Sequence, residues 1–378
     1  MQLIKYTFLS TLLIAVAFIG GRLLAEDAKK EEDRFEIKQG VYQQSDSGGQ
    51  ELVDEDETIF ETIILVSKKI DDKNTVNFRF LADIISSASI ERDHNQNYRA
   101  LQSGASGNTN FAGTIGWTHK FDGFDLGLNG SFGKEYAYDS MGYGINATVP
   151  LNNNNTILTG RLQFYNDTVR MIRFDGREDA DKDRDTFTVE FGVIQTLTPE
   201  DILHISFNHT EQDGFLATSY NSVFLNNVLS TETEEVSPKD RSRNALTTRY
   251  KHSLDKMSSY EMGYRLYDDD WGINSHTLDF RYFQYNKDKS LLHEPHYQFY
   301  LQSEADFYEE TFTGFTGVER TSDPDLGDFT AHALGYKVTV FKPKWFGYEG
   351  DWDFDFTYVS RSNDLNSMWF VTGYKTDF

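Results

Sequence analysis

The stretch Ser367–Phe378, SMWFVTGYKTDF, alternates bulky apolar and polar residues and ends on an aromatic residue. Phe370, Tyr374 and Phe378 share one parity, and Lys375 lies on the other. Successive side chains of a β-strand point to opposite faces, so the pattern predicts a strand with one aromatic face. An aromatic residue at the membrane–water boundary, ending the closing strand, is typical of an outer-membrane β-barrel. The stretch therefore predicts an all-β fold, a transmembrane antiparallel β-barrel.

The same period of two recurs through most of the chain. In Trp352–Tyr358, WDFDFTY, one face is wholly aromatic and the other is wholly polar. Similar alternation occurs within residues 186–197, 258–267 and 291–304. A helix would repeat every 3.6 residues instead, and no convincing helical stretch follows the N-terminal segment. A secreted β-sandwich or propeller is the soluble alternative, but it does not explain these lipid-like faces.

The N-terminus has the pattern of a secretory signal. Lys5 supplies a positive charge, and Phe8–Gly20 is an apolar run too short for a comfortable transmembrane helix. We expect residues 1–25 to be a signal peptide that is cleaved, with a retained anchor helix as the alternative. A short polar segment, 26–34, would then precede an outer-membrane barrel formed by residues 35–378.

The composition excludes several classes of function. The chain of 378 residues has a formal net charge of −24, and such acidity opposes binding to nucleic acid because the phosphates would repel it. It has no cysteine, which excludes disulfides, thiolate zinc sites, iron–sulfur clusters and c-type haem attachment. No later stretch is long and apolar enough for a transmembrane helix, so a membrane span must be a barrel. We expect no cofactor.

Turn signals divide the strands, and connections of two kinds alternate. Short polar connectors are predicted at 71–74, 122–123, 152–155, 198–201, 254–256, 286–289 and 342–350. The other series includes longer, more charged connectors near 44–57, 88–108, 166–185, 213–242 and 306–326, and short ones at 136–140, 268–272 and 361–366. In outer-membrane barrels short turns face the periplasm and long loops face outside. Counting back from Phe378 then requires a first strand near Phe35–Gln43 and about sixteen strands in all, with fourteen as the alternative.

Histidines on the predicted lipid faces provide a second check. All lie near strand ends, where the headgroup region tolerates them, at His119, His209, His252, His276, His293 and His332. A lipid-facing cation at the midplane would cost about 2–4 kcal/mol, and the clearest strands carry none there. Lys134 also lies near a strand end, from which its long side chain reaches water.

Several motifs go further than the fold class. The segment Tyr264–Thr277, YRLYDDDWGINSHT, resembles a signature of the domain of unknown function 3570 family of bacterial proteins. Tyr297–Tyr308 resembles the next strand of that family, and Asp83–Ser89 is similar to a third motif, with Ser87 in place of a glycine. Phe132–Ser140, with the later Asn155 and Thr156, resembles a fourth. The resemblance implies an outer-membrane barrel, and it carries over no reaction, ligand or catalytic residue.

The inward faces of the predicted strands in the second half of the chain carry charges of both signs. The candidate lumen-lining residues are Arg249, Lys251, Glu261, Arg265, Asp279, Arg281, Glu294, His296, Gln298 and Glu304. Arg79, Asp83 and Arg161 join them if the register holds. Opposite charges on neighbouring strands suit a constriction that selects solutes by charge, or an ion-pair network that braces or fills the barrel. Barrels of about sixteen strands usually leave an aqueous lumen, which supports the constriction.

Aspartates alternate through the loop 175–185, and Glu190 follows Asp179 at the spacing of a calcium loop. Arg184 stands where an EF-hand requires glycine, however, and Glu190 falls in a predicted strand. A solvated acidic outer loop is therefore the preferred interpretation. Loose bridging of divalent cations to lipopolysaccharide would be compatible with such a loop.

Other motifs with potential chemistry are better explained by structure. His293 and His296 are three residues apart, so they face opposite sides of a strand and do not chelate one metal ion. Asp268–Asp270 beside Trp271 predicts a tight acidic turn with an interfacial tryptophan, with cation binding as the alternative. The adjacent Ser275-His276 also point apart, and no nucleophile elbow or phosphate-binding glycine loop occurs. We therefore expect neither a metal site nor an enzyme.

The sequence predicts an outer-membrane barrel of a Gram-negative bacterium that acts as a passive channel for small hydrophilic solutes. The alternative is a closed barrel, filled by a polar network, that serves as a scaffold or as the outer-membrane partner of periplasmic proteins. Outer-membrane lipids and lipopolysaccharide are the expected surroundings, and no nucleic acid is expected as a partner. An enzymatic barrel is the third class that we weigh.

Overall fold

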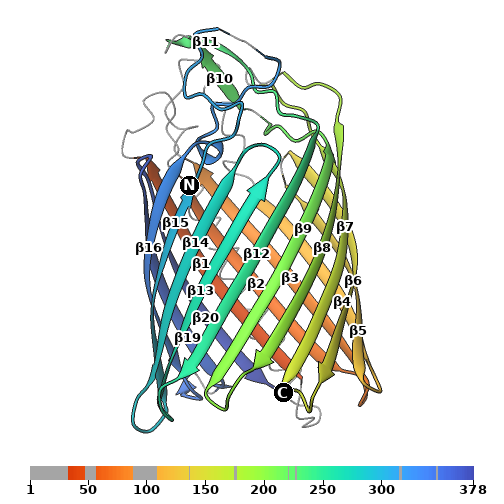
Figure 1. The fold of residues 1–378 in the computed structure, drawn as a ribbon, viewed down its shortest axis with the longest axis vertical. Coiled ribbons are helices and arrows are strands. Elements are labelled where there is room, and N and C mark those ends of the chain that lie inside the picture. The colour runs from red at the N-terminus through yellow and green to blue at the C-terminus, as the bar shows by residue number, and fades with distance from the viewer. Residues whose placement is uncertain are drawn as a thin grey trace.

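The computed structural model describes residues 33–46, 57–87, 109–135, 137–173, 177–219, 221–225, 228–314, 317–345 and 348–378. In this part of the chain sixteen antiparallel strands form one closed barrel (Figure 1). The predicted signal peptide, 1–25, and the polar segment as far as residue 32 lie outside the described residues. Within the described residues no helix is long and apolar enough to cross a membrane. The prediction of an all-β barrel of sixteen strands is confirmed.

The barrel strands follow one another around the ring in chain order. They are β1 (Arg34–Asp46), β2 (Glu57–Lys69), β3 (Asn74–Ser87), β4 (Thr109–Phe121), β5 (Phe124–Lys134), β6 (Tyr138–Leu151), β7 (Thr156–Val169), β8 (Lys182–Thr196), β9 (Asp201–Gly214), β12 (Asp240–Ser253), β13 (Ser258–Asp269), β14 (Asn274–Tyr285), β15 (Leu291–Gln302), β16 (Phe329–Val340), β19 (Asp351–Arg361) and β20 (Leu365–Asp377). Two small sheets lie within connections and were not predicted from the sequence. They pair β10 (Ser222–Leu225) with β11 (Val228–Glu234), and β17 (Lys344–Trp345) with β18 (Tyr348–Glu349).

The ring closes where β1 pairs with β20. This pairing runs from Arg34 opposite Asp377 to Asp46 opposite Leu365, and the other edge of β1 pairs with β2. Every barrel strand thus has two antiparallel neighbours, so none presents an unpaired edge. Backbone groups within a bilayer find no water to bind, and a closed ring satisfies them internally. The first strand expected near Phe35–Gln43 lies within β1.

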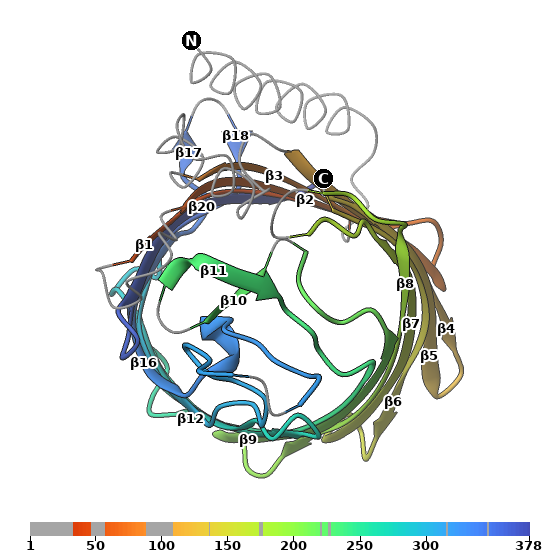
Figure 2. The same ribbon diagram turned by 90° about the horizontal axis from the view of Figure 1, so that it is seen from above.

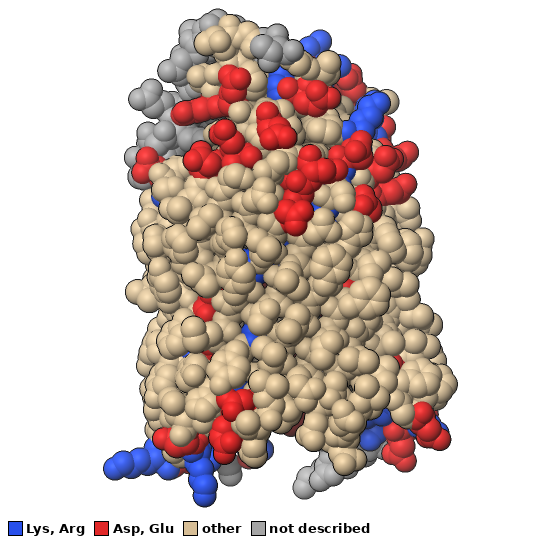
Figure 3. Space-filling view, viewed as in Figure 1, with Lys and Arg blue, Asp and Glu red and all other residues tan. Residues whose placement is uncertain are grey.

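The two faces of each strand differ in polarity, as β13 illustrates. Met262 and Tyr264 point outward and are 54% and 41% exposed, whereas Glu261 and Arg265 occupy the alternate, inward positions. The pattern recurs around the ring, up to Leu334, which is 67% exposed. In water such exposure would cost about 25 cal/mol per Å² of apolar surface. On the face that Figure 3 shows, the middle of the outer surface is nearly free of charged residues, which gather at the two ends. The outer face is therefore an apolar belt suited to acyl chains.

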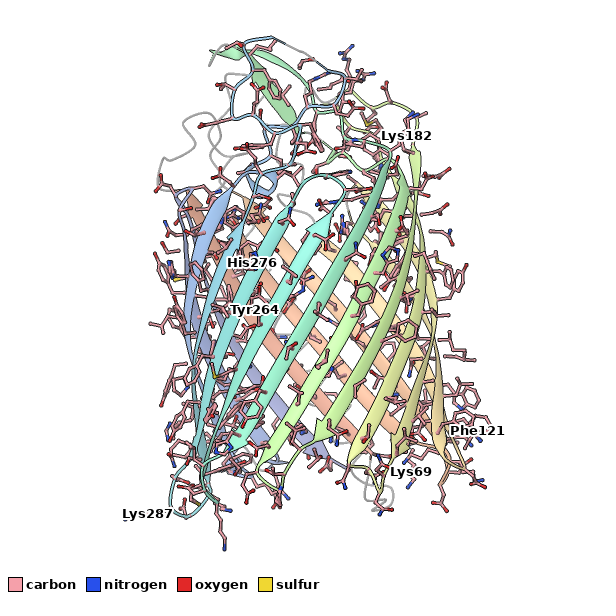
Figure 4. The ribbon with its side chains drawn as sticks, in the orientation of Figure 1. Lys69, Phe121, Lys182, Tyr264, His276 and Lys287 are labelled. Carbon is pink, nitrogen blue, oxygen red and sulfur yellow. The ribbon has the colours of Figure 1, made fainter. Side chains whose placement is uncertain are left out.

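The two ends of the barrel differ in the length of their connections. At one end, which we call the turn end, short turns such as 70–73 and 254–257 join the strands. The longer connections lie at the other end, which we call the loop end. Lys69 and Lys287 lie at the turn end and Lys182 at the loop end (Figure 4). The described connections alternate between the two ends as predicted, but β6, β7 and β8 extend into the connectors predicted at 136–140 and 166–185. Residues 47–56 and 88–108, in two of the predicted loops, lie outside the described residues.

One of the turns is formed by a run of asparagines. Asn152, Asn153 and Asn154 have φ angles of 52°, 57° and 66°, in the left-handed region. Asparagine enters this region more readily than most L residues because its short polar side chain can bond to nearby backbone. The run therefore reverses the chain tightly between β6 and β7 without glycine.

Outward-facing histidines near strand ends hydrogen-bond to tyrosines on neighbouring strands. The hydroxyl of Tyr264 lies 2.6 Å from Nδ1 of His276, and both side chains lie on the outer surface (Figure 4). Tyr297 and His332 form a similar pair at 2.7 Å. A buried polar group without a partner would be costly in an apolar environment. Each pair satisfies one ring nitrogen close to the margin of the apolar belt.

The outer position of Leu278 provides a test of the belt. Leu278 lies within β14 and is 52% exposed, so Leu278→Arg would place a charge against acyl chains. We expect it to lower the free energy of unfolding in lipid vesicles by about 2–4 kcal/mol, measured by urea titration. The control is Gln298→Arg, at an exposed inward position beside Asp279, where we expect a change below about 1 kcal/mol. Equal losses in both variants would contradict the assignment of faces.

Candidate functional site

The inward faces of β12 to β15 carry most of the residues that the sequence predicts to line a lumen. These lumen-lining residues alternate along each strand with outward-facing residues. They are Arg249, Lys251, Glu261, Arg265, Asp279, Arg281, Glu294, His296 and Gln298. Glu304 differs, because β15 ends at Gln302 and Glu304 lies exposed in the connection beyond it. Arg79, Asp83 and Arg161 occupy inward positions on β3 and β7. The fold thus assembles one charged wall and places Glu304 outside it.

Charges of opposite sign face one another across neighbouring strands of this wall. Lys251 lies opposite Glu261, and Glu261 lies opposite Arg281. Arg281 also reaches Glu294 on β15, with 3.1 Å between Nη1 and Oε1. Cross-strand pairs of opposite charge stabilise a sheet by roughly 0.2–1 kcal/mol each. The Arg281–Glu294 ion pair therefore braces this wall, and Glu261 lies between two cations.

His296 reaches across a neighbouring strand. Its Nε2 lies 3.1 Å from Oγ1 of Thr357 on β19, and β16 runs between the two strands. Gly335 on β16 leaves the necessary space, since a Cβ atom there would collide with the imidazole of His296. Further along β16, Lys337 pairs with Asp353 at 3.6 Å. Lys337 was not predicted from the sequence, although its inward parity on β16 could have identified it.

Several inward-facing side chains are nevertheless exposed. Arg249, Arg281 and Gln298 are exposed on the charged wall, and Arg79 and Arg161 are exposed on other strands. A side chain inside a barrel is exposed only when space large enough for water lies beside it. The interior is therefore not packed solid at these positions, and polar groups line the space.

Two long connections fold together at the loop end. They are residues 215–239, between β9 and β12, and residues 303–328, between β15 and β16. Seen along the barrel, β10, β11 and the second connection lie within the circle of strands (Figure 2). We call the described residues of these two connections the cap. The cap has a small buried core, in which Val223 and Thr321 are 0% exposed and Phe312 is 6% exposed.

Polar contacts hold the two halves of the cap together. Val236 and Arg320 form an antiparallel bridge with backbone hydrogen bonds of 3.0 and 2.9 Å. Beside this bridge, the Glu235 carboxyl group accepts hydrogen bonds from Thr321 Oγ1 at 2.6 Å and from Thr218 N at 2.9 Å. The Thr218 bond lies within the first connection, whereas the Thr321 bond joins residues 86 apart in sequence, so the cap depends on contact between its two halves.

The cap is also tied to the inner side of the barrel wall. Gln302, at the end of β15, donates to the carbonyl oxygens of Asp325 and Gly327 at 3.0 and 2.6 Å. Arg361 on β19 donates from Nη1 to Oδ1 of Asp325 at 2.7 Å, and its guanidinium lies 3.8 Å from the ring centre of Phe329. Both donors occupy inward positions, so the second connection is held over the mouth of the barrel.

Two carboxyl groups of the cap titrate above their usual range. Burial raises the pKa of Glu235 to about 7, because the charged form loses its water. Burial, reinforced by the neighbouring Asp325 carboxylate, raises the pKa of Asp323 to about 6. Asp323 also accepts a hydrogen bond from Asn221 at 3.1 Å. The folded cap therefore favours the protonated form of both groups.

A buried ion pair braces the short connection between β13 and β14. Arg241 donates to Oδ2 of Asp269 from Nε at 2.9 Å and from Nη2 at 2.5 Å, and the two side chains are only 11% and 0% exposed. The guanidinium also lies 4.1 Å from the ring centre of Trp271, which packs edge-on against Phe307. The prediction of an interfacial tryptophan is therefore wrong. Trp271 is 4% exposed because its indole is enclosed by these neighbours.

The aspartates of the acidic loop and the Ser275-His276 pair occupy places that the fold explains without catalysis or metal binding. Asp179 accepts a hydrogen bond from Nε of Arg173 at 2.7 Å, and Asp185 lies within β8. Ser275 is 2% exposed and faces inward, whereas His276 faces outward, so the two point apart as expected. Among the described residues, no group of three His, Cys, Asp or Glu side chains could hold a metal ion.

Comparisons with known proteins address the family and the fold. A family model described as "Protein of unknown function (DUF3570)" matches residues 10–364. A bacterial polysaccharide outer-membrane secretin matches with a TM-score of 0.51 at 9% identity, over 91% of this chain and 98% of that chain. The outer-membrane protein OpdK from Pseudomonas aeruginosa matches with a TM-score of 0.43 at 8% identity, over 92% and 99% of the two chains. No curated protein matches this chain. The family match confirms the resemblance drawn from Tyr264–Thr277, and likeness at these identities concerns the fold alone.

Removing the charge of Asp269 should destabilise the barrel. Asp269→Asn would leave the Arg241 guanidinium buried without its carboxylate, so we expect a loss of about 3–5 kcal/mol in the free energy of unfolding. Urea titration of the refolded barrel measures this change. Asp268→Asn is the matched control, since Asp268 is exposed and makes only a 3.4 Å bond to Asn244; its effect should stay within about 0.5 kcal/mol. Similar effects of both substitutions would refute the bracing role.

The cap should loosen as the pH rises. The pKa of Glu235 is raised from 4.5 to about 7 in the folded cap, so the folded cap binds more protons than the unfolded cap between these values. Its stability is therefore fully present below pH 4.5 and falls as the pH rises through about 7. We expect the protection of the Thr218 and Arg320 amides against hydrogen exchange, corrected for intrinsic rates, to decrease across this window. Glu235→Gln should flatten the decrease, and protection that rises with pH would contradict the assignment.

Proposed function

The chain belongs to the DUF3570 family of proteins of unknown function, and we propose that it is a passive channel for small hydrophilic solutes. The observation that carries this proposal is the exposure of inward-facing polar residues, Arg79, Arg161, Arg249, Arg281 and Gln298, on strands around the ring. Barrels of this strand number leave an aqueous lumen, unlike eight-stranded barrels, whose side chains fill the interior. A polar, hydrated interior inside an apolar belt provides a route for solutes that acyl chains exclude.

We further propose that the protein resides in the outer membrane of a Gram-negative bacterium, with the turn end in the periplasm. Short turns on one side and long loops on the other are typical of outer-membrane barrels. Acidic side chains gather above the apolar belt at the loop end (Figure 3). At that level they would lie beside lipopolysaccharide, whose phosphates they could join through divalent cations. Outer-membrane lipids and lipopolysaccharide are thus the surroundings that we assign.

The cap favours a second candidate function. Gln302 and Arg361 hold the 303–328 connection over the mouth at the loop end. A barrel closed in this way would act as a scaffold, or as the outer-membrane partner of a periplasmic protein, and its ion-paired wall would brace it. The two candidates differ in whether water and ions pass through the cap.

Single-channel recording in planar bilayers separates the two candidates. We expect the refolded barrel to produce discrete, ohmic current steps in potassium chloride. A variant in which residues 222–234 are replaced by a short glycine–serine linker should show larger steps, because this removes β10 and β11 from the loop end. The absence of steps from the folded wild-type protein would contradict the channel. Steps that appear only after the replacement would support the closed barrel.

A further inference from the structure

Four exposed, inward-facing arginines lie at one level of the barrel. Arg79 and Arg161 are each five residues from the turn-end start of their strands, β3 and β7. Arg249 and Arg281 are each four residues before the last residue of their strands, β12 and β14, which end at the turn end. Because the strands all end near one rim, residues equally far from it lie at similar heights. We call these four residues the arginine ring.

Two members of the ring have uncharged residues directly opposite them on both neighbouring strands. Arg79 lies opposite Leu65 on one neighbouring strand and Thr114 on the other. Arg249 lies opposite His204 and Gly263 in the same way. Neither arginine forms an ion pair or hydrogen bond with another described residue. The Asp279 carboxyl group and the Arg249 side chain both lie over Gly263, but they form no ion pair. Both guanidinium groups therefore keep unused donors that face the interior.

The other two members are only partly compensated. Arg161 donates from Nη2 to Oε1 of Gln163 at 3.2 Å, and Glu190 lies opposite it on β8. Arg281 pairs with Glu294, yet its side chain remains 47% exposed, whereas that of Glu294 is 10% exposed. In this pair the cation faces the interior space and the anion lies against the wall.

The remaining inward positions at this level add little negative charge. Most are glycine or small neutral residues, such as Asn129 on β5 and Ser206 on β9. Lys38 and His296 lie at the same distance from the rim, and Asp355 is the acidic residue that does. Basic residues therefore outnumber acidic ones at this level, although Glu190, Glu261 and Glu294 lie within one residue of it and the chain as a whole has a net charge of −24.

The ring also spans the interior. Arg79 lies on β3 and Arg249 lies on β12, which are separated by seven places in a ring of sixteen strands. The two strands lie on opposite sides of the circle (Figure 2). A solute that moves along the barrel passes between them. Gly263, next to Arg249, has no side chain of its own, and the side chains of Arg249 and Asp279 lie over it.

We propose that the arginine ring makes the interior selective for anions and binds small solutes that carry an oxyanion, either a carboxylate or a phosphate. A guanidinium donates two parallel hydrogen bonds to such a group. Rings of arginine or lysine give anion selectivity to pores, because a low-dielectric wall strengthens their field. This inference rests on the proposed channel function, and it names the charge class of the solute.

Reversal potentials across a gradient of potassium chloride test the ring. We expect the wild-type channel to prefer chloride over potassium. The double variant Arg79→Gln/Arg249→Gln should shift the permeability ratio toward potassium by about fivefold, which corresponds to losing about 1 kcal/mol of attraction for an anion. Inorganic phosphate and acetate, added separately, should reduce the wild-type chloride current. The double variant should lose most of this block.

Arg34→Gln is the matched control for charge. Arg34 lies at the turn-end rim, its side chain is 54% exposed, and it pairs weakly with Asp377 at 3.9 Å. It removes one positive charge away from the ring, as Arg249→Gln does within the ring, and the permeability ratio should stay unchanged. The single variant Arg249→Gln serves if the double variant does not refold, with a smaller shift in the same direction.

The outcomes separate the ring from the channel. A wild-type channel that prefers cations, or a ratio that the ring variants leave unchanged, would overturn the ring while the channel stands. Block by only one of the two anions would support the ring and assign the solute class to phosphate or to carboxylate. A folded wild-type barrel without conductance would overturn the channel and the ring together.

Discussion

The closed hydrogen-bonded ring is the constraint on which the rest of this structure depends. Because β1 pairs with both β2 and β20, each strand has one face inside the ring and one outside. Alternate side chains then meet different surroundings, acyl chains on one side and water or polar groups on the other. Met262 and Arg265 can therefore both be favourable on the same strand, although neither would suit the face of the other.

The sequence predicted the wall of the barrel well because strand alternation is a local property. Each strand carries its own period of two, so sixteen strands could be counted without any knowledge of contacts between distant residues. The cap had no such signature. Glu235 and Thr321 are 86 residues apart in sequence, and neither segment has a periodic pattern from which their contact could be predicted. Trp271 was misplaced for the same reason, since its burial depends on Arg241 and Phe307, which belong to other segments.

The sequence predicted which residues face the interior, but it did not predict which of them are paired and which are exposed. Alternation assigned Arg249, Glu261 and Arg281 to the inner face, as the structure also places them. Whether an inner residue is paired or exposed depends on the stagger between strands, which follows from turn lengths and from pairing in the folded state. The pair of Lys337 with Asp353 joins residues that are not direct cross-strand partners, because Lys337 lies opposite Asp355. Alternation therefore identifies which residues face inward, and only the assembled ring shows which of them can meet a solute.

The pairing of β1 with β20 also has a consequence for biogenesis. Arg34 and Asp377 are neighbours in the ring but lie at opposite ends of the described chain. Contacts between such distant residues form slowly, because the intervening chain must lose much of its entropy first. Until the two strands meet, any partial barrel has two free edges, which can pair with other chains and aggregate. The time needed for this encounter is therefore the time for which the newly made chain needs protection.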